Sequence, residues 1–226
     1  MSRGKKYQES AKKYDPSASC ELQEALGLVK TMAYAKFDET VDISVKLNLK
    51  KNQSVRDTTV LPHQFRGEKK VLVFCKPEKE KEAQDAGAAF VGADDLIGKI
   101  RGGWTDFDVA VATPDMMKDV GKLGMILGRK GLMPNPKTGT VTFDLKGALA
   151  ELKKGRTEFR ADKTGVVHLA VGKLSMENDK LAENIKTVVA EIKRKRPADA
   201  KGDFIQTVSI ASTMGPGVWV TIKDEE

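Results

Sequence analysis

The sequence is poor in the residues that build metal or redox sites. It has two cysteines and two histidines among 226 residues. Cys20 and Cys75 form no Cys-x-x-Cys pair, and His63 and His168 lie far from both of them. This spacing favours two reduced thiols in a cytosolic protein over a zinc site. We therefore expect no bound metal.

Long apolar runs are also absent. The basic N-terminal segment, residues 1–7, is followed by no apolar core, so it does not have the pattern of a signal peptide. No apolar run approaches the roughly 20 residues that a membrane-spanning helix needs. The sequence therefore predicts a soluble, cytoplasmic protein with no membrane partner.

Aromatic residues make up 6% of the chain, so aliphatic side chains must supply most of a core. The hydrophobic fraction of 40% is sufficient for a folded protein. Lys and Arg exceed Asp and Glu by 39 to 32. That surplus favours a polyanionic partner such as nucleic acid, although many soluble enzymes are equally basic. The cations at 193–196 suit the C-terminal end of a helix, with phosphate contact as a second option.

Two patterns of apolar residues alternate along the chain. Residues 41–49 alternate apolar and polar side chains, as in a half-buried strand, while 21–35 and 178–192 show helical spacing. The middle of the chain has short continuous apolar runs instead, at 71–75 and 107–113, each followed by a helical pattern. Such runs are typical of parallel strands that are buried on both faces.

An insertion explains this order of patterns. We expect residues 1–66 and 159–226 to form one discontinuous α+β domain, a sandwich built by both termini. Residues 67–158 would form an inserted, Rossmann-like, three-layer α/β domain. The chain then crosses between the domains twice at about the same place, which favours a hinge.

Residues 128–141 form a Gly/Pro-rich segment that predicts a long irregular loop. Its glycines permit positive φ, its prolines oppose a helix, and Arg129, Lys130 and Lys137 can meet phosphate. The spacing fits neither a Walker loop nor a dinucleotide fingerprint. Residues 128–131 match the Gly-x-x-Gly clamp of KH domains, but the prolines disfavour the second helix of that clamp. On the residues alone, a basic connecting loop and an RNA contact are equally favoured.

Taken whole, residues 128–141 resemble the signature of the bacterial large-subunit ribosomal protein L-one family, the proteins of the stalk at the tRNA exit site. Residues 36–41, residues 159–165 with His168, and residues 213–217 resemble the same family in the same order. The resemblance covers nearly the whole chain. It implies a non-enzymatic component of the large ribosomal subunit that binds ribosomal RNA by shape, backbone and 2′-OH contacts, without metal or cofactor.

The resemblance also implies which residues bind RNA. It places the junction at 36–40 beside the turn at 213–215, although on the residues alone Phe37 would be a core residue and the turn an ordinary one. The residues implied for ribosomal RNA are Lys36, Phe37, Thr40, Thr213, Met214 and Gly215, then Glu24 and Thr207, with Asp162, Lys163 and His168 on a supporting hairpin. Arg129, Lys130 and Lys137 would make a secondary contact with RNA or tRNA.

The implied partners are large-subunit ribosomal RNA, other ribosomal components, exit-site tRNA and the mRNA of the protein's own operon, whose translation the family represses. The protein would assist release of deacylated tRNA, and off the ribosome we expect a monomer.

Two further function classes compete with this interpretation. A nucleotide-binding protein or enzyme would need a phosphate-cradling loop after residues 71–75, and the segment 76–78 found there lacks glycine. A catalytic pair of His168 and Asp162 would need a nucleophile in a recognisable elbow, which the sequence does not show. The other competitor is a KH-like regulatory RNA binder that works through residues 128–131.

Overall fold

The structure, a computed structural model, describes residues 4–15, 18–50, 53–67, 69–153, 155–197 and 202–221. It is a mixed α/β protein with several sheets, which confirms the mixed α/β class expected from the sequence. The chain separates into two compact units, here called the outer unit (residues 1–65 and 158–226) and the inner unit (residues 66–157). No helix in the described ranges is both long and apolar enough to cross a membrane.

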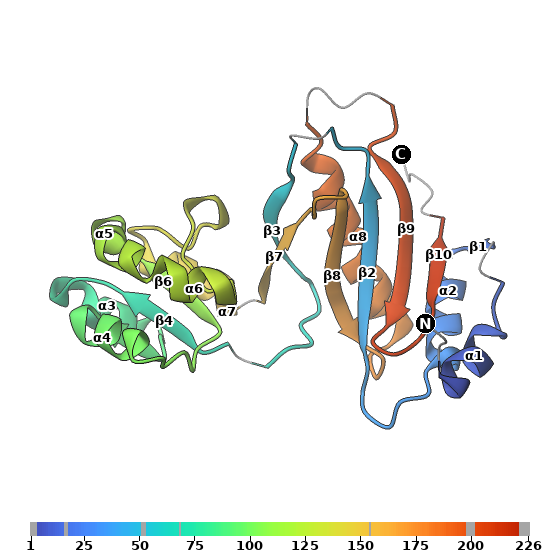
Figure 1. Ribbon diagram of the computed structural model, residues 1–226, viewed down its shortest axis with the longest axis horizontal. Coiled ribbons are helices and arrows are strands. Elements are labelled where there is room, and N and C mark those ends of the chain that lie inside the picture. The colour runs from blue at the N-terminus through green and yellow to red at the C-terminus, as the bar shows by residue number, and fades with distance from the viewer. Residues whose placement is uncertain are drawn as a thin grey trace. The chain divides into compact units, whose positions relative to one another are not determined.

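The outer unit contains a five-stranded sheet of order β1-β10-β9-β2-β8 and a two-stranded sheet of β3 and β7 (Figure 1). In the five-stranded sheet β1 is parallel to β10 and the other neighbours are antiparallel. The strands are β1 (Ser19–Cys20), β2 (Thr40–Leu47), β3 (Arg56–Val60), β7 (Arg156–Arg160), β8 (Val166–Lys173), β9 (Ile205–Ser212) and β10 (Gly217–Val220). The helices are α1 (Lys5–Ala11), α2 (Leu22–Met32) and α8 (Asn178–Arg194).

The five-stranded sheet has one buried face and one open face. Val41, Ile43 and Val45 of β2 are fully buried, while the residues between them are partly exposed. The apolar stripe of α8 and the buried residues of α2 belong to the same core as these valines and isoleucine. Figure 1 shows β2, β8 and β9 in front of α8, so the opposite, open face points to the viewer. The alternating pattern of residues 41–49 therefore places its polar positions on this open face.

The inner unit is built on a parallel sheet of order β5-β4-β6. All four residues of β4 are buried, and they face two cores in turn: Leu72 and Phe74 pack in one, Val71 and Val73 in the other. The strands are β4 (Val71–Phe74), β5 (Phe90–Gly92) and β6 (Val109–Ala112). The helices are α3 (Pro77–Asp85), α4 (Asp94–Arg101), α5 (Met117–Val120), α6 (Gly124–Lys130) and α7 (Leu145–Lys153), with 3₁₀ turns η1 (Pro114–Met116), η2 (Gly121–Leu123) and η3 (Pro136–Thr138).

Residues 128–141 are less irregular than the sequence suggested. The first three of them continue α6, because the prolines that oppose a helix come only after Gly131, which ends α6 with a φ of 72°. The rest is held by Asn135, whose N–H donates to Thr140 Oγ1 at 2.8 Å. The hydroxyls of Thr138 and Thr140 donate to Asn135 O at 3.0 and 3.1 Å. The segment is thus a helix end followed by a hydrogen-bonded turn.

Asn184 of α8 is fully buried and bonds three backbone groups. Its Nδ2 donates to Val171 O at 2.7 Å and to His63 O at 2.9 Å. Its Oδ1 accepts from His63 N at 3.0 Å. On the neighbouring position, Glu183 Oε2 lies 2.6 Å from His63 Nε2. One buried amide therefore joins the segment at His63 to α8 and β8.

Asn184→Leu should lower the free energy of unfolding by about 3 kcal/mol, because three backbone groups lose their partner. Urea denaturation of the full chain, followed by circular dichroism, measures this change. Glu183→Gln is the matched control, since it alters only an exposed pair on the same helix and should cost less than about 1 kcal/mol. Equal losses in both variants would contradict the role given to Asn184.

Candidate functional site

Two segments far apart in sequence meet at one end of the five-stranded sheet. One precedes β2 and ends at Thr40, and the other is the turn between β9 and β10. Thr40 N donates to Thr213 Oγ1 at 3.0 Å, and the Thr213 hydroxyl donates to Thr40 O at 3.2 Å. The structure thus brings together the residues that we call the junction site. They are Lys36, Phe37, Thr40, Thr213, Met214 and Gly215.

The side-chain oxygens of Glu39 connect the same two segments. Its side chain is buried, with 1% of the residue exposed. Glu39 Oε1 accepts from Ala35 N at 3.2 Å, and Oε2 accepts from Met214 N at 2.9 Å. Tyr34 OH adds a bond to Met214 O at 2.8 Å. Hydrogen bonds from backbone N–H groups compensate a carboxylate for its removal from water, so Glu39 holds the junction together.

The end of β8 and the turn that follows it contribute a third segment. Lys173 Nζ donates to Thr40 Oγ1 at 3.0 Å and to Asp38 O at 3.2 Å. The carboxylate of Asp38 accepts from Ser175 N at 3.1 Å and from Ser175 Oγ at 2.9 Å. Hydrogen bonds of four residues that were not predicted as site residues therefore hold the junction site in place. These residues are Tyr34, Asp38, Glu39 and Lys173.

The junction site presents apolar groups and bare backbone. Phe37 is 56% exposed and Met214 is 48% exposed, which is unusual for side chains of their size. Gly215 N donates to Ser212 Oγ at 3.1 Å, and a Cβ at position 215 would lie 2.4 Å from that oxygen. Exposed apolar groups can lie against sugars and bases, and a glycine such as Gly215, which has no side chain, permits close approach of a ribose. Lys36, which is exposed, adds a positive charge.

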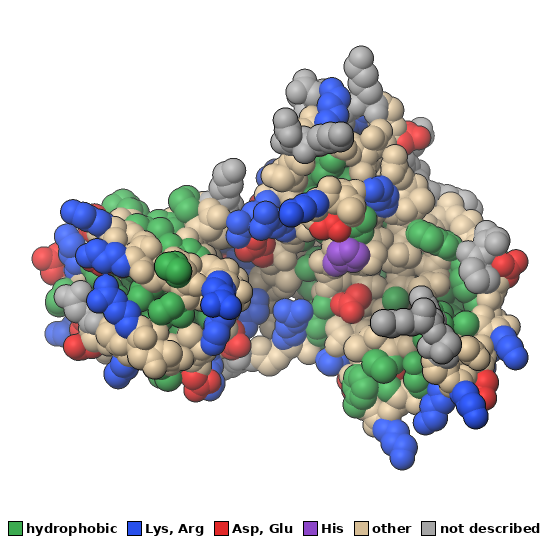
Figure 2. All heavy atoms as spheres, in the orientation of Figure 1, with side chains coloured by type: hydrophobic (Ala, Val, Ile, Leu, Met, Phe, Trp, Pro, Cys, Tyr) green, Lys and Arg blue, Asp and Glu red, His purple; other side chains and the backbone are tan. Residues whose placement is uncertain are grey.

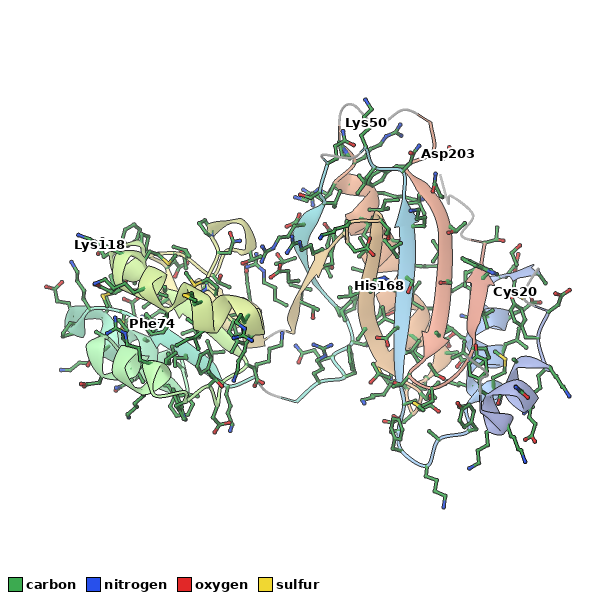
Figure 3. All side chains as sticks on the ribbon, in the orientation of Figure 1. Cys20, Lys50, Phe74, Lys118, His168 and Asp203 are labelled. Carbon is green, nitrogen blue, oxygen red and sulfur yellow. The ribbon has the colours of Figure 1, made fainter. Side chains whose placement is uncertain are left out.

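His168 and Thr207 lie away from the junction site, on the open face. His168 Nδ1 is 2.9 Å from Ser44 Oγ on the neighbouring strand. His168 is labelled in Figure 3, and Figure 2 shows a histidine side chain at the surface of the outer unit. Thr207 is the register partner of Lys46, towards the other end of β9. At roughly 3.4 Å per residue, Thr207 and Thr213 are about 20 Å apart along the strand.

Asp162 accepts hydrogen bonds within its own turn. Its Oδ1 accepts from Thr164 N and Val166 N, both at 2.8 Å, and from Thr164 Oγ1 at 2.7 Å. Two of these hydrogen bonds hold the pKa of the Asp162 carboxyl below its ordinary value. The larger effect comes from Val166 N, and the next comes from the Thr164 hydroxyl. An ionised Asp162 thus shapes the hairpin, and Lys163 is exposed at its tip.

The other predicted residues lie elsewhere. Glu24 is exposed in the first turn of α2 and takes no part in the bonds that form the junction site. Arg129 and Lys130 are exposed at the end of α6 in the inner unit, where Lys130 Nζ donates to Thr105 Oγ1. The backbone of Lys137 belongs to η3, and its side chain lies outside what the structure describes.

The competing functions lack support in this structure. In the inner unit α3 begins at Pro77, directly after the N-cap Lys76, so no glycine loop follows β4. Residues 128–131 do not join two helices, because α6 ends there and α7 begins only at Leu145. Among the described residues, no three His, Cys, Asp or Glu side chains group closely enough to hold a metal ion.

Comparison with known proteins gives consistent matches over the full chain. The sequence model described as "Ribosomal protein L1p/L10e family" matches residues 29–216. A "Large ribosomal subunit protein uL1" from Treponema denticola is 66% identical over 223 residues, which is 99% of this chain and 99% of the relative. Proteins with the same name from Treponema pallidum (strain Nichols) and Leptospira biflexa are 58% and 57% identical, over 100% and 99% of this chain and 100% and 97% of their own.

Gly215→Ala should weaken binding to large-subunit ribosomal RNA about tenfold, since about 1.4 kcal/mol is lost with the Ser212 bond and the turn's shape. Gly217→Ala is the control, because a Cβ there meets nothing within 4 Å. Titration of both variants in a filter-binding assay at one salt concentration makes the comparison. An unchanged affinity of Gly215→Ala would remove this turn from the site.

Proposed function

The chain belongs to the ribosomal protein L1 family, and from this premise we propose that it binds large-subunit ribosomal RNA through the junction site as a structural constituent of the large ribosomal subunit. The relatives compared above are named as proteins of that subunit. The family is structural and not enzymatic, so the expectation that the chain is not an enzyme is confirmed by its family.

The observation that carries this proposal is the exposure of Phe37 and Met214 on segments that are firmly fixed. Glu39 and Thr213 hold both segments by hydrogen bonds to backbone groups. A preformed surface loses little conformational entropy when it binds. Aromatic and apolar side chains beside hydroxyls and a glycine suit RNA, whose bases and 2′-OH groups need such partners.

The open face extends the proposed surface. Thr207 and His168 are exposed there, and Lys163 is exposed at the tip of the hairpin before β8. A folded RNA element that lies on the junction site would reach them. Asp162 acts by shaping the hairpin, and Glu24 stands at the margin on α2. We assign these roles to a discontinuous RNA-binding domain of residues 1–66 and 159–226.

The inserted domain, residues 67–158, is assigned the secondary contact. Arg129 and Lys130 form a pair of cations at the end of α6, where positive side chains also complement the helix C-terminus. With Lys137 they would meet phosphates of RNA or of tRNA at the exit site. Contact of this kind supports a part in the mobile stalk and in the release of deacylated tRNA.

Regulation follows from the same surface. We propose that the protein represses translation of its own operon by binding an mRNA copy of the ribosomal site, and that it acts as a monomer when it is off the ribosome. Both RNAs would then compete for the junction site. The location that fits these roles is the ribosome in the cytoplasm.

Substitutions in the junction site should weaken ribosomal RNA binding far more than substitutions in α6. We expect about a tenfold loss for Thr213→Val, which lacks the hydroxyl bond to Thr40, and a greater loss for Met214→Asp, whose charge opposes phosphate. Changing Arg129 and Lys130 together to Ala should cost about threefold or less, since exposed phosphate contacts are individually weak. Gel-shift titration at one ionic strength gives the ranking.

The reverse ranking would move the main RNA site to the inner unit. Footprinting of the purified protein on deproteinised large-subunit RNA tests the proposal more broadly. A single protected region that is lost in Met214→Asp is the expected result. If no region is protected, ribosomal RNA is not the partner of this surface.

A further inference from the structure

Trp219 is a large aromatic residue on the open face of the five-stranded sheet. Val218 and Val220, its neighbours along β10, are buried in the core that α2 and α8 share. Alternation along a strand therefore places the indole on the opposite face, away from α8. The residue is 43% exposed, although tryptophan is mostly buried in folded proteins. The junction site does not include it.

The strand register places three further residues in one line with Trp219. Trp219 pairs with Ser209 on β9, which pairs with Ser44 on β2. Ser44 pairs in turn with His168 on β8, and Figure 1 shows these four strands side by side. Directly paired residues share a face of the sheet, and neighbouring strands lie about 4.8 Å apart. The backbones of Trp219 and His168 are therefore about 14 Å apart, with two serines between them.

The residues around the indole are small. On the same face of β10, the residue towards the junction site is Gly217, which has no side chain. The partner of Trp219 on β1 is Ser19, and Thr221 follows the strand at its other end. Among the described residues, none of these neighbours is large enough to cover the ring. The indole thus offers a flat aromatic surface on which another ring can stack.

The backbone that carries the indole is fixed on the side away from β9 as well. Trp219 N donates to Tyr14 OH at 3.2 Å, and Thr221 N donates to Cys20 O at 3.0 Å. Tyr14 is itself buried. An aromatic side chain on a fixed strand loses little conformational entropy when it binds a partner.

The open face is continuous from this line of residues to the junction site. Along β2, Thr40 and Ser44 are about 14 Å apart at roughly 3.4 Å per residue. The line between them contains no large apolar side chain; it consists of Gly217, Ala211, Asp42 and Ala170. An RNA element that lies on the junction site and extends over this face therefore meets the indole.

The lysines of this face are already hydrogen-bonded. On the described parts of β2, β8, β9 and β10 they are Lys46 and Lys173. Lys46 Nζ donates to Thr164 O, and Lys173 Nζ donates to Thr40 Oγ1 at 3.0 Å. The surface around Trp219 thus supplies a ring and hydroxyl groups. These groups suit a base better than a phosphate.

We propose that an unpaired base of the RNA bound at the junction site stacks on Trp219, with the Ser209 hydroxyl available to the base edge or the ribose. A sheet face whose aromatic residues stack bases is a general means of RNA recognition. The inference rests on the proposed function and deepens it. It adds a contact that requires a nucleotide outside a paired helix.

Substitution of Trp219 in the full chain tests the inference. Trp219→Ser should weaken binding to deproteinised large-subunit RNA about tenfold through loss of stacking. Trp219→Phe keeps a ring and should stay within about threefold of the parent chain. The dependence of the affinity on salt should remain that of the parent chain, because no phosphate contact is lost. Filter binding at several salt concentrations gives both quantities.

Val60→Ser is the matched control. Val60 is 42% exposed and lies on β3, outside the five-stranded sheet. The substitution removes an exposed apolar side chain from the same unit and should leave the affinity unchanged. Circular dichroism of all variants shows whether they retain the fold of the parent chain.

Acrylamide quenching tests the stacking directly. The chain has two tryptophans, so Trp219 is the single indole in the variant Trp104→Phe. Saturation of this variant with deproteinised large-subunit RNA should lower the quenching of its emission by acrylamide, because a stacked base covers the ring. A fully paired RNA duplex has no unpaired base and should leave the quenching unchanged.

Unchanged affinity of Trp219→Ser, or equal protection by the paired duplex, would overturn the inference. Binding of the parent chain to ribosomal RNA would still support the proposed function in that case. A loss in Trp219→Phe as great as that in Trp219→Ser would also overturn stacking, because a ring would then not suffice. If the parent chain does not bind ribosomal RNA, the proposed function fails, and this inference fails with it.

Discussion

The buried carboxylate of Glu39 is the interaction on which the candidate RNA surface depends. It accepts hydrogen bonds from Ala35 N and from Met214 N, and so it joins the approach to β2 with the turn before β10. Without it, the backbone N–H groups of Ala35 and Met214 would lose their partner. The two segments would then rely on the bonds of Thr213 with Thr40 and of Tyr34 with Met214. Burying an unpaired carboxylate is costly. The two hydrogen bonds therefore stabilise the buried Glu39 side chain, and they also fix the geometry of the junction. Phe37 and Met214 can remain exposed because the backbone beneath them is held.

Much of the fold follows from local patterns in the sequence. The alternation in residues 41–49 predicts β2 with one buried face, and the continuous run at 71–75 predicts β4, which is buried on both faces. Periodicity succeeds here because the order of apolar and polar residues along a strand reflects burial on one face or on two. It fails where distant contacts decide. β3 pairs with β7 about 100 residues later, and α6 extends to Lys130 because Gly131 can adopt the left-handed conformation that ends it.

The sequence predicted only part of the candidate site. The family resemblance indicated Phe37, Thr213 and their neighbours, which on the residues alone would be a core residue and a turn. Glu39 lies within the segment 36–41 that carries the resemblance, and Tyr34 lies outside it. Neither was predicted as a site residue, since their roles depend on contacts with Ala35 and Met214 that form in the folded chain.

The bond between Thr40 and Thr213 spans 173 positions in the chain. During synthesis Thr40 is made 173 positions before Thr213. Contacts of such long range form late, after the intervening chain has been made and closed. A nascent or truncated chain that stops before residue 213 lacks half of the junction site. The proposed RNA surface is therefore a property of chains that extend beyond residue 215, and fragments that end earlier lack it.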